Sequence, residues 1–173
     1  MKKIMMILWA SGSVLYTQAQ VAIGKPNVTN SSVSLEFAST ENKGLILPYN
    51  INKSAITENG TMIYDTTDHK VKYLKDNAWF DLSVDTTGTA DLSIQGSDKT
   101  EQPGAKVSIY TTGNTDSTAG ILVLGDTNRA MVLPKVASPH LNIINPSPGM
   151  MVYDTTKRQL AVYNGTVWSF WKP

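Results

Sequence analysis

The motif GMMVYDTT at residues 149–156 decides the fold, because the chain also contains GTMIYDTT at residues 60–67. Each motif lies between a proline that closes an apolar run and a tryptophan: Pro48 and Trp79 in the first copy, Pro134 and Trp168 in the second. A repeat of this length indicates one structural unit that is copied within the chain.

A nearly constant spacing relates the two copies. Pro48 and Pro134 are 86 residues apart (134 − 48), whereas Tyr64 and Tyr153 are 89 residues apart (153 − 64). Three residues are therefore added between the proline and the motif of the second copy. The added segment contains three prolines, as expected where a surface connection is lengthened: Pro139, Pro146 and Pro148.

The same register aligns the start of each copy and sets the predicted organisation. A spacing of 86 carries Val21 onto Val107, Leu35 onto Ile121 and Phe37 onto Val123. We predict a signal peptide, a first β repeat, a polar linker and a second β repeat, at residues 1–19, 20–82, 83–106 and 107–173. The expected fold class is all-β or mostly β.

The second half of each copy has the pattern of a three-stranded meander. In the second copy, Leu160 and Val162 alternate with Ala161 and Tyr163, which predicts a strand with two distinct faces. Asn164-Gly165 follows, and this dipeptide is typical of a type I′ hairpin turn. The first copy has the weaker turn sequence Lys75-Asp76-Asn77.

The first half of each copy has shorter strand signals. Val33, Leu35 and Phe37 alternate with polar residues and predict a half-buried strand. Residues 45–47 predict a short buried strand that ends at Pro48, because proline cannot donate a ladder hydrogen bond. We expect a loop with at most one helical turn at residues 49–59, and one strand in the linker around residues 90–94.

The N-terminus indicates export. Lys2 and Lys3 precede an apolar run at residues 4–16, and Thr17-Gln18-Ala19 is typical of a cleavage site after Ala19. The alternative is a membrane anchor, but the run is shorter than the roughly 20 residues that a span requires. We therefore expect an extracellular, cell-surface or periplasmic protein with no membrane span after cleavage.

Composition favours self-association and argues against nucleic-acid binding. The chain has no cysteine and thus no disulfide. Each copy has a size at which a single core is marginal, so association of copies into a homo-oligomer such as a trimer would add stability. The chain has 15 basic and 14 acidic residues and no basic cluster, and therefore lacks the charge footprint of a nucleic-acid-binding protein.

The sequence contains no convincing catalytic or metal-binding set. His69 and His140 occupy unrelated places in the two copies, whereas a triad or a zinc site requires several convergent groups. Asp65 and Asp154 recur, each before two threonines. They could ligate calcium, but an Asx-turn between two strands is the simpler interpretation. We expect no catalytic residue, no cofactor and no metal.

Recurring aromatic residues are the candidates for contact with a ligand or partner. They are Trp79, Tyr153, Trp168 and Trp171. On an exposed sheet face such residues can stack on sugars or anchor a protein partner. The alternative is cross-strand packing within a small sheet.

Three blocks of this sequence resemble secreted repeat proteins of Bacteroidetes-type bacteria. Residues 21–24 (VAIG) resemble their VGIG opening, residues 42–48 (NKGLILP) their NKGLLLPR block, and residues 60–79 and 149–168 their GLMVYDTTTKKLYVYNGTAW block. Tyr49 departs from the basic residue that is usual after the proline, whereas Lys135 keeps it.

The resemblance implies a β-rich surface protein, of a kind compared with phage tail fibres and adhesins, without established enzymatic activity. It also implies O-glycosylation at Asp-Ser/Thr motifs: Thr66, Thr86, Ser117 and Thr155.

We therefore expect a non-enzymatic, exported structural or adhesion protein, which forms a homo-oligomer and meets a surface glycan or protein partner. The alternative is a carbohydrate-binding module that uses exposed Trp and Tyr residues. A hydrolase is a third hypothesis, and it is disfavoured because acid–base groups neither recur nor cluster.

Overall fold

The computed structural model describes residues 19–93, 102, 104–111 and 116–172. The predicted signal peptide, apart from Ala19, lies outside the described residues. The described chain is built from short strands and one single-turn helix, α1 (Pro139–Asn142), so the predicted β-rich fold with two meander units is confirmed. Among the described residues, no helix combines the length and apolar character needed to cross a membrane.

Each copy ends in a meander that is extended by one parallel strand. In the first copy the order is β4 (Tyr49–Asn50), β5 (Met62–Asp65), β6 (Lys70–Lys75) and β7 (Ala78–Asp81). In the second copy it is β11 (Lys135–Val136), β12 (Met150–Asp154), β13 (Gln159–Tyr163) and β14 (Trp168–Trp171). Tyr64 lies opposite Val71, and Tyr153 lies opposite Leu160, so the two copies share one register.

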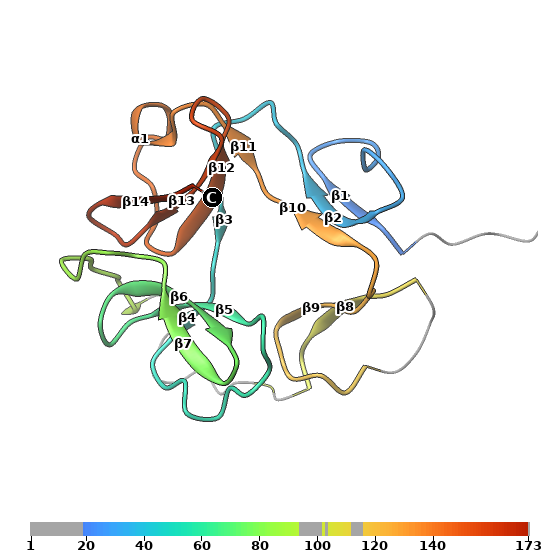
Figure 1. Cartoon of the computed structure of the whole chain (residues 1–173), viewed down its shortest axis with the longest axis horizontal. Coiled ribbons are helices and arrows are strands. Elements are labelled where there is room, and N and C mark those ends of the chain that lie inside the picture. Colours follow the sequence, from blue (N-terminus) through green and yellow to red (C-terminus); the bar gives the residue numbers. More distant parts are fainter. Residues whose placement is uncertain (1–18, 94–101, 103, 112–115, 173) are drawn as a thin grey trace, which may run out of the picture.

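Each copy begins with a parallel pair of strands. These pairs are β1 (Val21–Ile23) with β2 (Val33–Phe37), and β8 (Val107–Ile109) with β9 (Leu122–Leu124). The two remaining strands cross between copies. β10 (Ala130–Val132) lies parallel to β2, and β3 (Leu45–Ile46) lies antiparallel to β12. The copies are therefore interlocked, and Figure 1 shows the four small sheets and the crossing strands.

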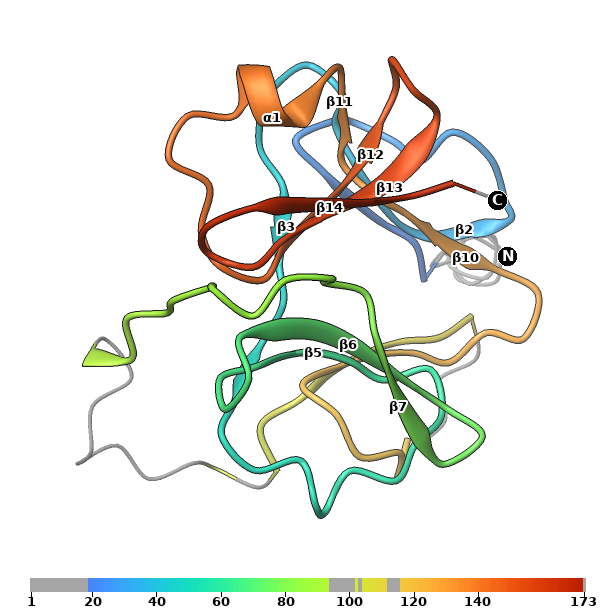
Figure 2. The same cartoon turned by 60° about the vertical axis from the view of Figure 1, so that its left-hand side comes forward.

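The main hydrophobic core lies between the two meanders, which Figure 2 shows one above the other. Tyr64 and Val71 of the first copy pack in one cluster with Met151 and Val162 of the second. Leu160 packs against the same cluster, whereas Ala161 and Tyr163 belong to a second cluster on the opposite face of the sheet. The predicted alternation along β13 is thus confirmed, and each copy buries its inner face against the other.

The short strands around Pro48 differ from the prediction. β3 is not a buried strand over residues 45–47, because it spans only Leu45–Ile46 and Ile46 is 47% exposed. Residues 49–50, predicted to lie in a loop, form β4.

Two further strand predictions need correction. Residues 33–36 are all buried, so β2 is not half-buried. The polar Glu36 is buried because Lys25 and Thr29 bind its carboxylate. Val21 lies opposite Leu35 whereas Val107 lies opposite Leu122, so the second copy has one extra residue between its paired strands. Leu35 therefore corresponds to Leu122 and not to Ile121, and a shift of one residue exchanges the two faces of a strand.

The hairpin turns also differ from the prediction. Asp76 and Asn77 both have positive φ, 51° and 58°, and they form the two-residue turn between β6 and β7. In the second copy Gly165 has φ 105° whereas Asn164 is not among the residues with positive φ, and Asn164 N–H donates to Val167 C=O (3.2 Å). The turn is therefore centred on Gly165 and Thr166. The reason is that the Asn164 side chain accepts hydrogen bonds from the N–H groups of Thr166 and Val167.

The segment that follows β7, at residues 82–88, packs against the second copy. Val84 N–H donates to Ser169 Oγ (3.1 Å), and Asn164 Nδ2 donates to Asp85 C=O (3.1 Å). A side chain on Gly88 would place its Cβ 2.1 Å from the carbonyl oxygen of Asn164, so the contact requires glycine. Residues 90–93 form no strand, contrary to the prediction, and Ile94 lies outside the described residues.

Candidate functional site

The aromatic candidates lie on different faces of the molecule. Trp168 packs on Tyr163 with ring centroids 5.2 Å apart and lies against the outer cluster of the second meander. Trp171 is three residues further along β14 and therefore points to the opposite face. Its indole N–H donates to Leu82 C=O, although the residue remains exposed. The two indoles thus form no common stacking platform.

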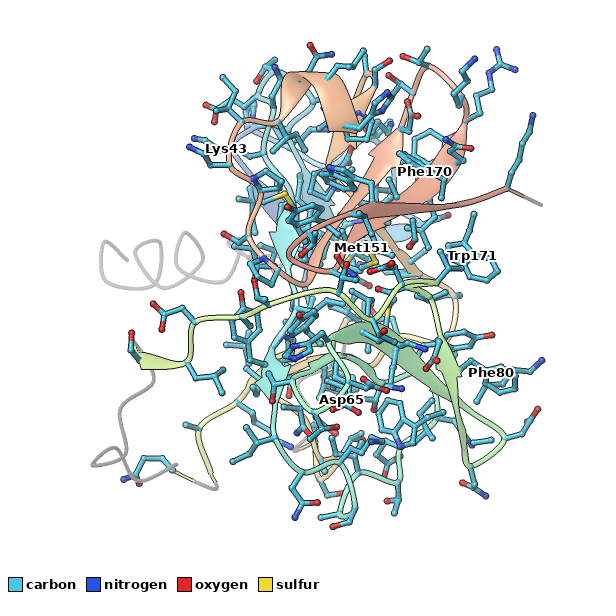
Figure 3. All side chains as sticks on the ribbon, turned by 90° about the vertical axis from the view of Figure 1, so that its left-hand side faces the viewer. Lys43, Asp65, Phe80, Met151, Phe170 and Trp171 are labelled. Carbon is cyan, nitrogen blue, oxygen red and sulfur yellow. The ribbon has the colours of Figure 1, made fainter. Side chains whose placement is uncertain are left out.

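The other two candidates are half-buried. Tyr153 lies opposite Leu160 on β12. Trp79 lies opposite Leu74 and lines a pocket of about 670 Å³ on the outer face of the first meander. Sequence reasoning did not identify Phe80 and Phe170, which are exposed on the edge strands β7 and β14. Figure 3 shows Phe80, Phe170 and Trp171 along one side of the molecule, and Met151 between the meanders.

The pocket beside Trp79 has a polar wall. Lys53 Nζ and Asp65 Oδ2 are 2.6 Å apart and both residues line it, together with Leu74 and Asn77. Burial raises the pKa of the Asp65 carboxyl, but the hydrogen bonds from Lys53 and Thr67 outweigh burial and hold this pKa below its ordinary value. The carboxylate is therefore already neutralised by Lys53 within the chain.

The recurring aspartates form Asx-turns, as predicted. Thr67 N–H donates to Asp65 Oδ1 (3.0 Å), and Thr156 N–H donates to Asp154 Oδ1 (2.9 Å). Asp154 also accepts from the N–H of Ser138 (3.1 Å). Burial raises the pKa of Asp154, but these backbone donors outweigh it and keep the pKa lowered. Both carboxylates thus organise the turn that connects two strands.

Candidate catalytic groups remain apart. His69 lies in the turn before β6, with φ 58°, and His140 lies on α1 with its ring edge against Phe170 (centroids 5.6 Å apart). No group of three or more His, Cys, Asp or Glu side chains within the described residues could hold a metal ion. Among the described residues, neither histidine forms a hydrogen bond with a serine or threonine hydroxyl, so neither is an oriented base beside a nucleophile.

A buried carboxylate on β2 was not identified from the sequence. Glu36 is 3% exposed, and its Oε1 lies 2.6 Å from Lys25 Nζ. The Thr29 hydroxyl and N–H also donate to it, at 2.6 Å each. Hydrogen bonds from Lys25 and then from Thr29 lower its pKa from 4.5 to about 2. The alternation of β2 suggested an exposed Glu36, whereas Lys25 and Thr29, which precede β2, bind its carboxylate.

A buried hydrogen bond joins the two copies. Tyr64 is fully buried, and its hydroxyl donates to the carbonyl of Asn164 (2.6 Å), 100 residues away. Burial raises the pKa of Tyr64 to about 12, so the phenol remains protonated and can serve as this donor. The counterpart Tyr153 is only half-buried.

The residues proposed for glycosylation lie in different environments. Thr86, Ser117 and Thr155 are exposed. Thr66 is half-buried, and its hydroxyl donates to the carbonyl of Asn50 (3.1 Å). Three of the four hydroxyl-bearing residues are therefore at the surface.

The second copy exposes large apolar side chains on two patches. On the first, Val107 and Leu122 lie opposite each other on β8 and β9 with exposed fractions of 59% and 43%. Ile121, which precedes β9 in the sequence, is 62% exposed. On the second, Leu141 and Ile144 lie on and just after α1. Contiguous exposed apolar residues are typical of surfaces that another chain covers.

Comparison with known proteins adds one match. Residues 106–172 match the model of a family described as phage tail like trimerisation region. No curated protein matches the chain, and no solved structure matches it. The matched segment extends from the residue before β8 through β14, so the second copy of the repeat is similar to a trimerisation region of phage-tail-like proteins.

Proposed function

We propose that this chain is a non-enzymatic, exported structural protein that acts as a homotrimer in a tail-fibre-like or adhesive surface assembly. The observation that carries the proposal is the match of residues 106–172 to a phage-tail-like trimerisation region. The β-rich fold supports the structural part of the proposal, and the predicted signal peptide motivates export.

Exposed apolar residues within the matched segment support association between chains. Val107, Ile121 and Leu122 would lose their contact with water if a second chain covered the β8–β9 sheet. Burial of apolar surface is the main favourable contribution to most protein association. A trimer would also display each surface three times, so an adhesive contact of low affinity would gain strength through multivalency.

The carbohydrate-binding alternative has weaker support. Trp168 is half-buried beside Tyr163, and Trp171 points to the opposite face of β14 with its N–H bonded to Leu82. A glycan array with the wild type and Trp171→Ala tests this alternative. A glycan bound by the wild type and lost in the variant would support it, and equal profiles would count against a role for this indole.

The mass of the mature protein in solution tests the trimer. Light scattering coupled to size-exclusion chromatography should give three times the mass of one chain over a wide range of concentrations. A mass of one chain at every concentration would contradict the proposal. Surface labelling of intact cells tests export separately, and protein found only after lysis would contradict a surface location.

A further inference from the structure

The two parallel sheets differ in one strand. β1–β2 and β8–β9 begin with equivalent pairs, Val21 opposite Leu35 and Val107 opposite Leu122. The far edge of β2 carries β10, whereas no strand among the described residues pairs with the far edge of β9. By comparison with β2, the position beside β9 that a third strand would occupy is therefore empty among the described strands.

The free edge of β9 presents backbone groups of known residues. Val107 N–H donates to Ile121 C=O (2.8 Å), and Gly125 N–H donates to Ile109 C=O (3.1 Å). Alternate residues of a strand direct their N–H and C=O groups to opposite edges. Leu122 and Leu124 therefore direct theirs to the free edge, which is a template for an added strand.

The strand that fits this position can be read from the repeat. β10 carries Met131 opposite Leu35 and Val132 opposite Glu36. Met131 and Val132 correspond to Leu45 and Ile46 of β3 at the spacing of 86 residues. The repeat therefore assigns the equivalent contact on β9 to the sequence of β3, although β3 pairs with β12 within the chain.

The outer edge of β3 has the matching hydrogen-bonding pattern. Leu47 N–H donates to Gly149 C=O (3.0 Å), so Leu47 faces the β12 side. By the same alternation, Ile46 directs its N–H and C=O away from β12. Ile46 is also 47% exposed. β3 can therefore add to another strand while it keeps its pairing with β12.

We propose that β9 of one chain receives β3 of a second copy as a parallel strand, with Leu45 opposite Leu122 and Ile46 opposite Val123. This inference rests on the proposed trimer, because the occupant is a second copy of a chain whose β9 lies in the matched trimerisation region. The contact joins two different surfaces, and such a head-to-tail contact builds a closed ring when the rotation between chains closes. Three chains would form three identical β3–β9 contacts.

Disulfide trapping tests the contact in the mature protein, which has no native cysteine. The double variant Ile46→Cys/Val123→Cys is oxidised and run on a denaturing, non-reducing gel. Neighbouring strands are about 4.8 Å apart, within the range that a disulfide bridges, whereas a position one strand further is about 10 Å away. The matched control is Ile46→Cys/Ser108→Cys, because Ser108 lies opposite Val123 on β8.

We expect covalent trimers from Ile46→Cys/Val123→Cys and none from the control pair. An equimolar mixture of the two single variants, Ile46→Cys and Val123→Cys, should give covalent dimers, because each chain then has one thiol. A cross-link within one chain, with no dimer from the mixture, would overturn the inference, since β9 would then hold its own β3.

The same samples separate failure of the inference from failure of the proposed function. A three-chain mass without any cross-link would overturn the β3–β9 contact and leave the trimer standing. A one-chain mass without any cross-link would overturn both. Reduced samples with the wild-type circular dichroism spectrum establish that the substitutions preserve the fold.

Discussion

The outer faces of the two meanders differ, although their strands pair in the same register. In the second copy Ala161 is fully buried and packs with Val136 and Ile143. The counterpart of Ala161 is Lys72, which lies 2.6 Å from both Asp68 and Asp81. The counterpart of Val136 is Asn50.

This difference shows what each copy contributes. Both meanders pack their inner faces in the shared core, but only the second also packs its outer face in an apolar cluster. The outer face of the first buries Ile63 and Leu74, but it also carries ion pairs and the pocket beside Trp79. The copy that matches the trimerisation region is therefore the one whose outer face forms an apolar cluster.

The largest loss of stability is expected when Ala161, on the outer face of the second copy, is replaced by lysine, the residue at the equivalent position of the first copy. Ala161→Lys would place an ammonium group against Val136 and Ile143 and should destabilise the fold by about 3–5 kcal/mol, the cost of an uncompensated buried charge. The matched control, Lys72→Ala, should cost less, because Asp68 and Asp81 are 38% exposed and Asp81 keeps its ion pair with Lys70. Urea unfolding followed by tryptophan fluorescence measures both, and equal losses would break the comparison.

The two copies also differ at the position of Glu36 on β2. This residue is a buried carboxylate in the first copy, whereas the equivalent residue on β9 is Val123. The folded-state pKa of Glu36 is about 2, below the ordinary 4.5, so its contribution to stability is present above pH 4.5 and is lost as the pH falls toward 2. The shift corresponds to about 3 kcal/mol. We expect Glu36→Gln to be less stable than the wild type by up to this amount at pH 7.

Urea unfolding of the wild type and Glu36→Gln between pH 7 and pH 2 measures this contribution. The difference in free energy of unfolding should shrink as the pH falls and vanish near pH 2. Since the other carboxylates are common to both proteins, a difference that stays constant with pH would show that Glu36 acts through packing and not through its charge.

A smaller effect is expected at the link between the copies. Tyr64→Phe removes the hydrogen bond to the Asn164 carbonyl and leaves that buried acceptor without this donor, at a cost of about 1–3 kcal/mol. Tyr153→Phe, at the equivalent half-buried position, should change stability by about 0.5 kcal/mol or less. Thermal unfolding of both variants tests this asymmetry, and a larger loss for Tyr153→Phe would reverse it.

The local features of the fold could be predicted from the sequence. The meanders, the strand break at Pro48 and the Asx-turns at Asp65 and Asp154 follow from residues close together in the chain. The hairpin turn at Asn164 was misplaced by one residue because its side chain caps the turn and also holds Asp85. The dipeptide alone does not reveal this distant partner.

The long-range features could not be predicted. The repeat suggested two separate units, but β10 pairs with β2 and β3 pairs with β12 across the copies. Such crossing pairs depend on the arrangement of the whole chain, and strands of two or three residues carry no pattern that selects a partner. The extra residue before β9 was hidden for the same reason, since only strand pairing reveals which residue faces which.

The central claim is that chains associate through the free edge of the second copy, and the solution mass of one edge variant tests it most directly. Leu122→Pro removes the N–H group that Leu122 directs to the free edge of β9. The hydrogen bonds between β8 and β9 at Ile121 and Gly125 do not use this N–H group. By light scattering at equal concentration, we expect the wild type to have the mass of three chains. We expect Leu122→Pro to have the mass of one chain and to keep the wild-type circular dichroism spectrum. A one-chain mass for the wild type, or a three-chain mass for the folded variant, would contradict the claim.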